Sequence, residues 1–155
     1  MQLQEKIDSK VMTDVIIRQM YKMDSLTEVR FNDFTADVIL INQKKRKLVG
    51  VEIKSDKDSP RRLTNQLRGY LRWFHAVYVA CTISQLPKVL NVLKAPEFAR
   101  VGVLLYMNEV NDIRFDIYKK AVPVDDIVGV NANWISKQHQ LYQYKWLLDE
   151  VWNKE

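Results

Sequence analysis

The sequence predicts a mixed α/β domain organised around a central sheet. Apolar residues recur at helical spacing near the start of the chain, and several later runs rich in valine and isoleucine are typical of strands. A chain of 155 residues has the length of one domain, and no repeat, low-complexity tract or Gly/Ser linker divides it. We therefore expect a single domain over residues 1–155, with helices flanking the sheet.

Each element follows from a local pattern. Ile7, Val11 and Val15 recur at helical spacing, and Ser59-Pro60 is typical of a helix start, because proline is tolerated at the first helical position. Ser84 is expected to cap a later helix. In chain order the sequence predicts a helix over 2–22, strands over 27–31, 36–42 and 47–54, a helix over 59–74, a strand over 76–82, a helix over 84–94, strands over 101–107 and 113–119 joined by the turn 108–112, and a helix over 133–152.

Composition narrows the functional class. The formal net charge is +5 and the pI is about 9.3, which is compatible with a polyanionic partner such as nucleic acid. The N-terminus does not resemble a secretory signal, and the longest apolar stretch, 101–107, is too short to span a bilayer. We expect a cytoplasmic protein with no membrane partner.

The residue counts also bear on metal sites. Two histidines and one cysteine argue against structural zinc, and Cys81 is expected to be buried. The sequence contains no glycine-rich phosphate loop, which argues against an NTPase.

Two predicted strands flank the polar turn 43–46 and are expected to form an antiparallel hairpin. If Asn42 pairs with Lys47, counting back along both strands places Asp37 opposite Glu52. Directly opposed residues point to the same face of a sheet, with Cβ atoms about 5 Å apart. The spacing therefore predicts two neighbouring carboxylates.

Lys54 lies two residues beyond Glu52 and shares its face. Adjacent carboxylates repel unless something compensates their charge, and Mg²⁺ is a natural compensation because it accepts carboxylate ligands and keeps part of its hydration shell. A metal-bound water becomes a nucleophile near neutral pH, and the ammonium helps to stabilise charge on a phosphate. The alternative for Glu-x-Lys is an exposed polar strand face, but the apolar Val51 and Ile53 favour a central strand.

The helix predicted after this hairpin has one apolar and one basic stripe. The apolar stripe comprises Leu63, Leu67, Tyr70 and Phe74, and the basic stripe comprises Arg61, Asn65, Arg68 and Arg72. Arginine suits bidentate contacts with phosphate, so the candidate nucleic-acid ligands are Arg61, Arg62, Arg68 and Arg72. A solvated helix surface without a ligand is an equally favoured alternative. Lys44 and Lys45 at the hairpin turn are further candidates for backbone contacts.

Asp37 and the triplet Glu52-Ile53-Lys54 resemble the motif of the PD-(D/E)XK nucleases. The order helix, three strands, helix, strand resembles the shared core of that superfamily. The stretch VEIKSDKDSPRRLTNQ over 51–66 is similar to a family of small, mostly uncharacterised bacterial and phage nuclease-like proteins. The resemblance covers roughly residues 25–82.

The resemblance implies a restriction-endonuclease-like core of one helix, three antiparallel strands, a helix and a strand. It implies dependence on Mg²⁺ or Mn²⁺ and cleavage of DNA, with an endonuclease as the expected form. By analogy Asp37, Glu52 and the Ile53 carbonyl are metal ligands, and Lys54 positions the attacking water.

Gln66 and Tyr70 resemble the Gln-x-x-x-Tyr motif that some DNA exonucleases of the superfamily carry after the lysine. This resemblance adds Gln66 to the catalytic residues and Tyr70 to the nucleic-acid contacts. The residue before Asp37 is Ala36 instead of proline, which is a common departure in the superfamily.

Many members of the superfamily add an acidic residue from the first helix. Glu5, Asp8 and Asp14 are available there, but none has matching context. Glu28 is the choice for this further metal ligand because it lies near the first predicted strand of the core, and Asp33 is its rival. Plain surface acids are the simpler explanation of both.

Other functions and partners remain open at this stage. One is a catalytically inactive nucleic-acid-binding module on a nuclease-like fold, and another is a nuclease subunit of a larger assembly with partner proteins. A homodimer is also open. His75 and His139 are better explained as helix-end residues than as phosphate ligands. The segment 133–152 is rich in aromatics, for which packing over the sheet is favoured over stacking on bases, with a dimer contact also open.

Overall fold

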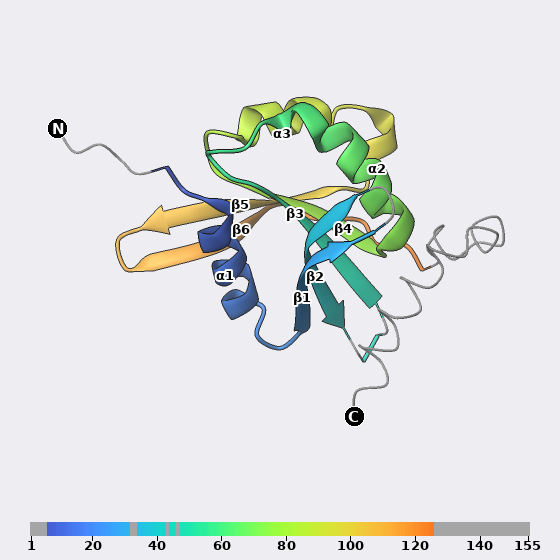
Figure 1. Cartoon of the computed structure of the whole chain (residues 1–155), viewed down its shortest axis with the longest axis horizontal. Helices are drawn as coiled ribbons and strands as arrows, with labels where there is room; N and C mark the ends of the chain where they lie inside the picture. Colours follow the sequence, from blue (N-terminus) through green and yellow to red (C-terminus); the bar gives the residue numbers. More distant parts are fainter. Residues whose placement is uncertain (1–5, 32–33, 43, 46, 126–155) are drawn as a thin grey trace.

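A six-stranded mixed sheet lies at the centre of the fold (Figure 1). The computed structural model describes residues 6–31, 34–42, 44–45 and 47–125. The elements in chain order are α1 (Ser9–Gln19), β1 (Asp24–Arg30), β2 (Thr35–Asn42), β3 (Lys47–Lys54), the 3-10 helix η1 (Pro60–Arg62), α2 (Leu63–Trp73), β4 (Ala76–Cys81), α3 (Leu86–Val92), the 3-10 helix η2 (Pro96–Phe98), β5 (Gly102–Glu109) and β6 (Asp112–Lys119).

The sheet combines antiparallel and parallel pairs in the order β1-β2-β3-β4-β5-β6. Strands β1, β2 and β3 pair antiparallel, β3, β4 and β5 pair in parallel, and β6 returns antiparallel to β5. The predicted α/β class, with a mixed sheet and flanking helices, is therefore confirmed. The helix, three antiparallel strands, helix and strand follow one another in the predicted order.

Helix α1 is shorter than the predicted helix over 2–22, of which residues 2–5 lie outside the described residues. It starts after Asp8, whose carboxylate accepts a hydrogen bond from Val11 N at 3.0 Å and caps the first turn. At its other end, the Gln19 side chain exchanges two hydrogen bonds with the backbone of Phe115, at 2.8 and 2.7 Å. These bonds fix the end of α1 against β6.

The connection from β3 to β4 is a helical crossover, as parallel neighbours require. Ser59 Oγ accepts a hydrogen bond from Arg61 N at 3.3 Å, so the predicted helix start is confirmed, although the first turn is 3-10 helix. The predicted apolar stripe is also confirmed, because each of its four side chains is 0% exposed.

Gly50 allows α2 to approach the sheet closely. A Cβ atom at this position would lie 2.7 Å from the ring atom Cδ2 of Tyr70, and it would also collide with Phe74. The missing side chain therefore makes room for the two aromatic rings that anchor α2 over β3.

The two faces of the sheet carry different helices. Residues of α2, α3 and η2 pack on one face, whereas α1 packs on the other (Figure 1).

The later helices differ in part from the prediction. Helix α3 begins at Leu86, and Ser84, which was expected to be its cap, instead donates a hydrogen bond to Asp56. The predicted helix over 133–152 lies outside the described residues. No helix in the described ranges combines the length and apolar character that a membrane span requires.

Candidate active site

The hairpin of β2 and β3 has the register that the sequence predicted. Asn42 pairs with Lys47 and Val38 with Val51, so Asp37 and Glu52 follow at the next position of the two strands. Asp37 Oδ2 accepts a hydrogen bond from the backbone N–H of Ile53 at 2.8 Å. The two predicted carboxylates are therefore neighbours across the hairpin.

The two acids strongly influence one another. Burial and, after it, the nearby Asp37 carboxyl raise the pKa of the Glu52 carboxyl from 4.5 to about 9. Burial also raises the pKa of Asp37, while the hydrogen bond from Ile53 N opposes that effect. The charge of Lys54 lowers both pKa values without cancelling the rise. At neutral pH and without a further cation, Glu52 consequently keeps its proton.

Tyr70 of α2 contacts both acids through its hydroxyl group. Its hydroxyl oxygen accepts a hydrogen bond from Asp37 N at 2.9 Å and lies 3.4 Å from Glu52 Oε2 and 3.3 Å from Val51 O. The Tyr70 side chain is 0% exposed and lies against the acids, and its contact with nucleic acid stays a prediction. The tyrosine lies on the apolar stripe of α2, and that stripe faces the sheet.

Lys54 and Gln66 form a hydrogen-bonded pair at the same site. Lys54 Nζ donates a hydrogen bond to Gln66 Oε1 at 3.0 Å. Gln66 lies one helical turn before Tyr70, which places both side chains on the same side of α2. The spacing Gln-x-x-x-Tyr thus brings the amide to the lysine and the hydroxyl to the acids.

The donor atoms of this site suit a divalent cation. Two neighbouring acids with raised pKa values gain from an added cation because it stabilises their charged forms. Carboxylate and backbone carbonyl oxygens are also ligands that Mg²⁺ accepts. Within the described ranges, however, no group of three His, Cys, Asp or Glu side chains is placed to hold a metal ion. The acid pair fits a cation, and a full shell needs further oxygens from backbone, water or substrate.

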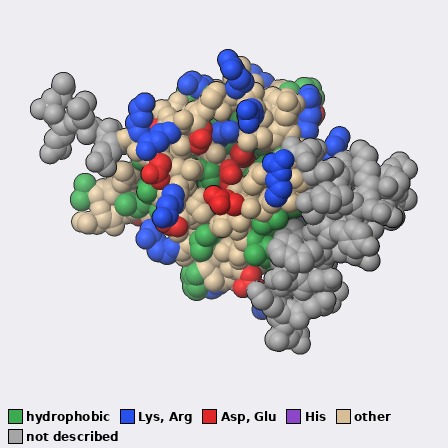
Figure 2. Space-filling model, viewed as in Figure 1, with side chains coloured by type: hydrophobic (Ala, Val, Ile, Leu, Met, Phe, Trp, Pro, Cys, Tyr) green, Lys and Arg blue, Asp and Glu red, His purple; other side chains and the backbone are tan. Residues whose placement is uncertain are grey.

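A cavity of about 360 Å³ opens beside Asp37. Asp37 and Ile53 reach it from the sheet, Asp14 from α1 and Glu28 from β1. The other lining residues are Ser9, Lys10, Thr13, Ile17 and Thr27. In the face of the molecule that Figure 2 draws, acidic side chains lie near the middle, with Lys and Arg side chains around them. Glu52 is 2% exposed and does not line the cavity.

This cavity bears on the choice of a third acid. Glu28 lies next to Asp37, as proposed from the sequence, and has a φ of 52° where the ladder between β1 and β2 is interrupted. Asp14 lines the same cavity from α1, although nothing in its sequence context singled it out. Asp8 caps α1, while Glu5 and Asp33 lie outside the described residues.

The candidate nucleic-acid ligands are spread over two regions. Arg61 and Arg62 are exposed on η1, close in sequence to Lys54. Arg72 is exposed on α2, whereas Arg68 forms a two-pronged ion pair with Glu97, at 2.6 and 3.2 Å. The exposed Lys44 and Lys45 lie at the far end of the hairpin, on the order of 20 Å from the acids at about 3.3 Å per residue.

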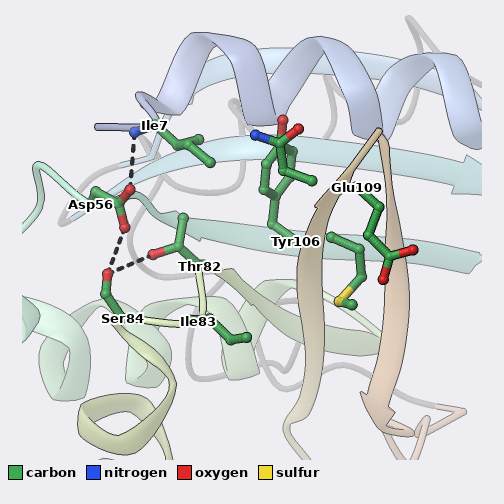
Figure 3. Close-up of a pocket in the computed structure, with 9 residues that line it drawn as sticks. Ile7, Asp56, Thr82, Ile83, Ser84, Tyr106 and Glu109 are labelled. Carbon is green, nitrogen blue, oxygen red and sulfur yellow. Dashed lines mark hydrogen bonds between the residues drawn. The ribbon is translucent and has the colours of Figure 1, made fainter. Parts of the chain in front are cut away.

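A second cavity of about 560 Å³ lies at the carboxyl ends of β3 and β4 (Figure 3). Asp56 Oδ2 accepts a hydrogen bond from Ile7 N at 3.0 Å, and Ile7 O accepts one from Asp56 N at 3.1 Å. Ser84 Oγ donates to Asp56 Oδ1 at 2.5 Å and lies 3.1 Å from Thr82 Oγ1. This network ties the residues before α1 to the sheet and so positions the helix that walls the Asp37 cavity.

His75 and Cys81 are structural residues. His75 Nδ1 accepts a hydrogen bond from Leu48 N at 3.0 Å inside the protein, so its explanation as a helix-end residue is confirmed. Cys81 is 0% exposed, as expected. His139 and the aromatic residues of 133–152 lie outside the described residues.

Comparison with known proteins adds a family but no activity. A protein of unknown function from Silicibacter pomeroyi has a solved structure that aligns with a TM-score of 0.54 at 15% identity, over 88% of this chain and 86% of that chain. A likeness at this identity shows a shared fold alone. No curated protein matches the chain. The family model described as bacteriophage P4 protein cII matches residues 4–135, and this chain therefore belongs to the bacteriophage P4 protein cII family.

Proposed function

We propose that this protein is a metal-dependent nuclease that hydrolyses DNA phosphodiester bonds on a restriction-endonuclease-like core. The observation that carries the proposal is the cluster of Asp37, Glu52 and Lys54 at one end of the β2–β3 hairpin, held by Gln66 and Tyr70 of α2. Residues from two strands and a helix converge on one pair of acids. Such convergence is expected of a functional site and is costly in a purely structural one, because buried like charges repel.

The residues have distinct roles in this proposal. Asp37, Glu52 and the Ile53 backbone carbonyl would hold Mg²⁺ or Mn²⁺, with Glu28 or Asp14 as a further ligand across the Asp37 cavity. Such a cation supplies Lewis acidity toward the phosphate and lowers the pKa of a bound water.

Lys54 would hold the attacking water or a phosphate oxygen, and Gln66 keeps its ammonium in place. Tyr70 fixes the backbone of Asp37 and the carboxyl of Glu52, so that the two acids keep their spacing. Arg61 and Arg62 are exposed beside the start of α2 and would bind the phosphates that flank the scissile bond.

The test is cleavage of plasmid, linear duplex, branched and single-stranded DNA with Mg²⁺ or Mn²⁺. Asp37→Asn, Glu52→Gln and Lys54→Met should each reduce the rate by about 100-fold or more. The first two weaken the proposed metal site, and the third removes the ammonium that would stabilise charge on the phosphate. Asp112→Asn, at an exposed site in the β5–β6 hairpin, is the matched control and should cut like the wild type. Equal cleavage by all variants would show that the activity comes from elsewhere.

One observation favours a second function, a nucleic-acid-binding module without activity of its own. Glu52 and Lys54 are only 2% and 5% exposed, so a substrate reaches them only if the surrounding chain moves. Calorimetry with Mn²⁺ separates the two functions. The nuclease should bind the ion with release of protons from Glu52 and Asp37, whereas the module should bind DNA without any such site. A nuclease subunit of a larger assembly would show the metal site but no cleavage alone.

A further inference from the structure

An apolar groove of about 310 Å³ lies on the face of the sheet that carries α1. Its lining is almost entirely apolar: Ile16, Gln19, Met20, Met23, Leu40, Val49, Val51, Ala76, Tyr78, Leu104, Phe115, Ile117, Lys120, Ala121 and Pro123. Ile117 on β6 is 62% exposed at its edge. None of these residues belongs to the acid cluster, so the groove is a separate feature from the proposed active site.

The groove exists because α1 is too short to cover its face of the sheet. Eleven helical residues extend about 16 Å, whereas six strands at about 4.8 Å spacing span about 24 Å. The strands β3, β4 and β5 run parallel, and parallel strands are normally covered on both faces. The opposite face has α2, α3 and η2, so one layer is incomplete on the α1 side.

The described chain ends at the rim of this groove. Pro123 lines it, and the next residue, Val124, donates a backbone hydrogen bond to His75 O at 2.8 Å. Asp125 O then accepts a hydrogen bond from Lys47 Nζ at 3.1 Å. His75 directly precedes β4, and Lys47 is the first residue of β3. The chain therefore leaves the described region beside the start of β3 and β4, which share the lining of the groove with β2, β5 and β6. The Val124 side chain packs against the core on the α2 side, so the exit lies at the end of the sheet between its two faces.

The remaining sequence has the pattern that such a groove needs. Over the predicted helix 133–152, apolar residues recur at Leu141, Tyr144, Leu148 and Trp152, with spacings of three and four residues that place them on one helical face. A helix of that length extends about 30 Å, which is enough to cross the sheet. We propose that residues 126–155 fold back on their own chain and fill the apolar groove with this aromatic and aliphatic stripe.

Photo-cross-linking in the full-length protein tests the occupant. p-Benzoyl-phenylalanine in place of Ile117 should form a cross-link to a peptide of 126–155, and the product should run as a monomer on a denaturing gel. The same group in place of Tyr118, the next residue on β6, should not cross-link to this segment, because Tyr118 does not line the groove. A cross-linked dimer would assign the groove to a second copy of the chain. A product without any peptide of 126–155 would also overturn the proposal.

Limited trypsin digestion gives an independent measurement. Ile117→Glu places a charge at the groove edge, and it should increase cleavage after Lys137 and Lys145 by about tenfold or more, because apolar contacts against a carboxylate are lost. Tyr118→Glu is the matched control and should leave cleavage unchanged. Circular dichroism verifies that both variants are folded. Equal cleavage of the wild type and both variants would mean that this segment does not dock in the groove.

Discussion

Replacing Glu52 with glutamine should make the stability of the protein much less dependent on pH. Glu52 has an ordinary pKa of 4.5, and burial with the Asp37 carboxyl raises it to about 9 in the folded protein. Between these two values the folded protein binds a proton that the unfolded chain has released. The stabilising contribution of Glu52 is therefore complete below about pH 4.5 and is lost as the pH rises toward about 9.

The size of the effect follows from the width of this window. Each pH unit inside it lowers the free energy of unfolding by about 1.36 kcal/mol, so that about 4 kcal/mol is lost between about pH 5 and about pH 8. The raised pKa of Asp37 acts in the same direction. Glutamine has nearly the same shape as protonated glutamate and does not titrate, so Glu52→Gln should remove the slope that Glu52 contributes.

The assay is urea unfolding followed by circular dichroism at several pH values. The difference in free energy of unfolding between wild type and Glu52→Gln cancels the contributions of groups common to both, and it should change by several kcal/mol across the window in favour of the variant at high pH. Asp112→Asn, an exposed acid, is the control and should show a nearly constant difference. If the wild type and Glu52→Gln curves run parallel from about pH 5 to about pH 8, the carboxyl is not a buried member of an acid pair.

Three further predictions concern the same site and its support. Tyr70→Phe should lower the free energy of unfolding by about 1–3 kcal/mol in urea titrations, because Asp37 N loses its acceptor. Tyr118→Phe on the surface should change it by less than about 0.5 kcal/mol. If Tyr70→Phe leaves the free energy of unfolding unchanged, the hydroxyl does not support the site. Gly50→Ala should cost about 1–3 kcal/mol in the same measurement, since its Cβ would lie 2.7 Å from Tyr70 Cδ2, and a neutral result would show that α2 can shift away from β3. Mg²⁺ or Mn²⁺ at a hundred times its dissociation constant should stabilise the wild type by about 2.7 kcal/mol, and therefore raise its melting temperature by roughly 2–4 °C for each kcal/mol, at about pH 8. Asp37→Asn should not respond to the ion, and an equal response of both proteins would place the binding elsewhere.

The β2–β3 hairpin could be predicted from sequence because its signals are local. The polar turn and the alternation on both strands allow one simple register, and Asn42 does pair with Lys47. The start of α2 was predictable for the same reason, since Ser59 and Pro60 act within their own turn. The two stripes of α2 followed from helical periodicity, and the buried stripe includes Tyr70.

The features that could not be predicted depend on contacts between distant segments. The burial of Glu52 comes from packing of α2 on β3, and the ion pair of Arg68 comes from η2 through Glu97. Asp14 lies in the Asp37 cavity because hydrogen bonds at both ends of α1 fix that helix to the sheet. None of these contacts has a signature in the residues that immediately surround it.

The acid cluster has a consequence for the order in which the protein is made. Asp37, Glu52, Lys54, Gln66 and Tyr70 all lie within one continuous stretch that ends before β4 begins. Contacts of short sequence separation form faster than those between distant segments. As the chain emerges from the ribosome, the hairpin and α2 can therefore assemble their shared polar contacts while β5 and β6 are still being translated.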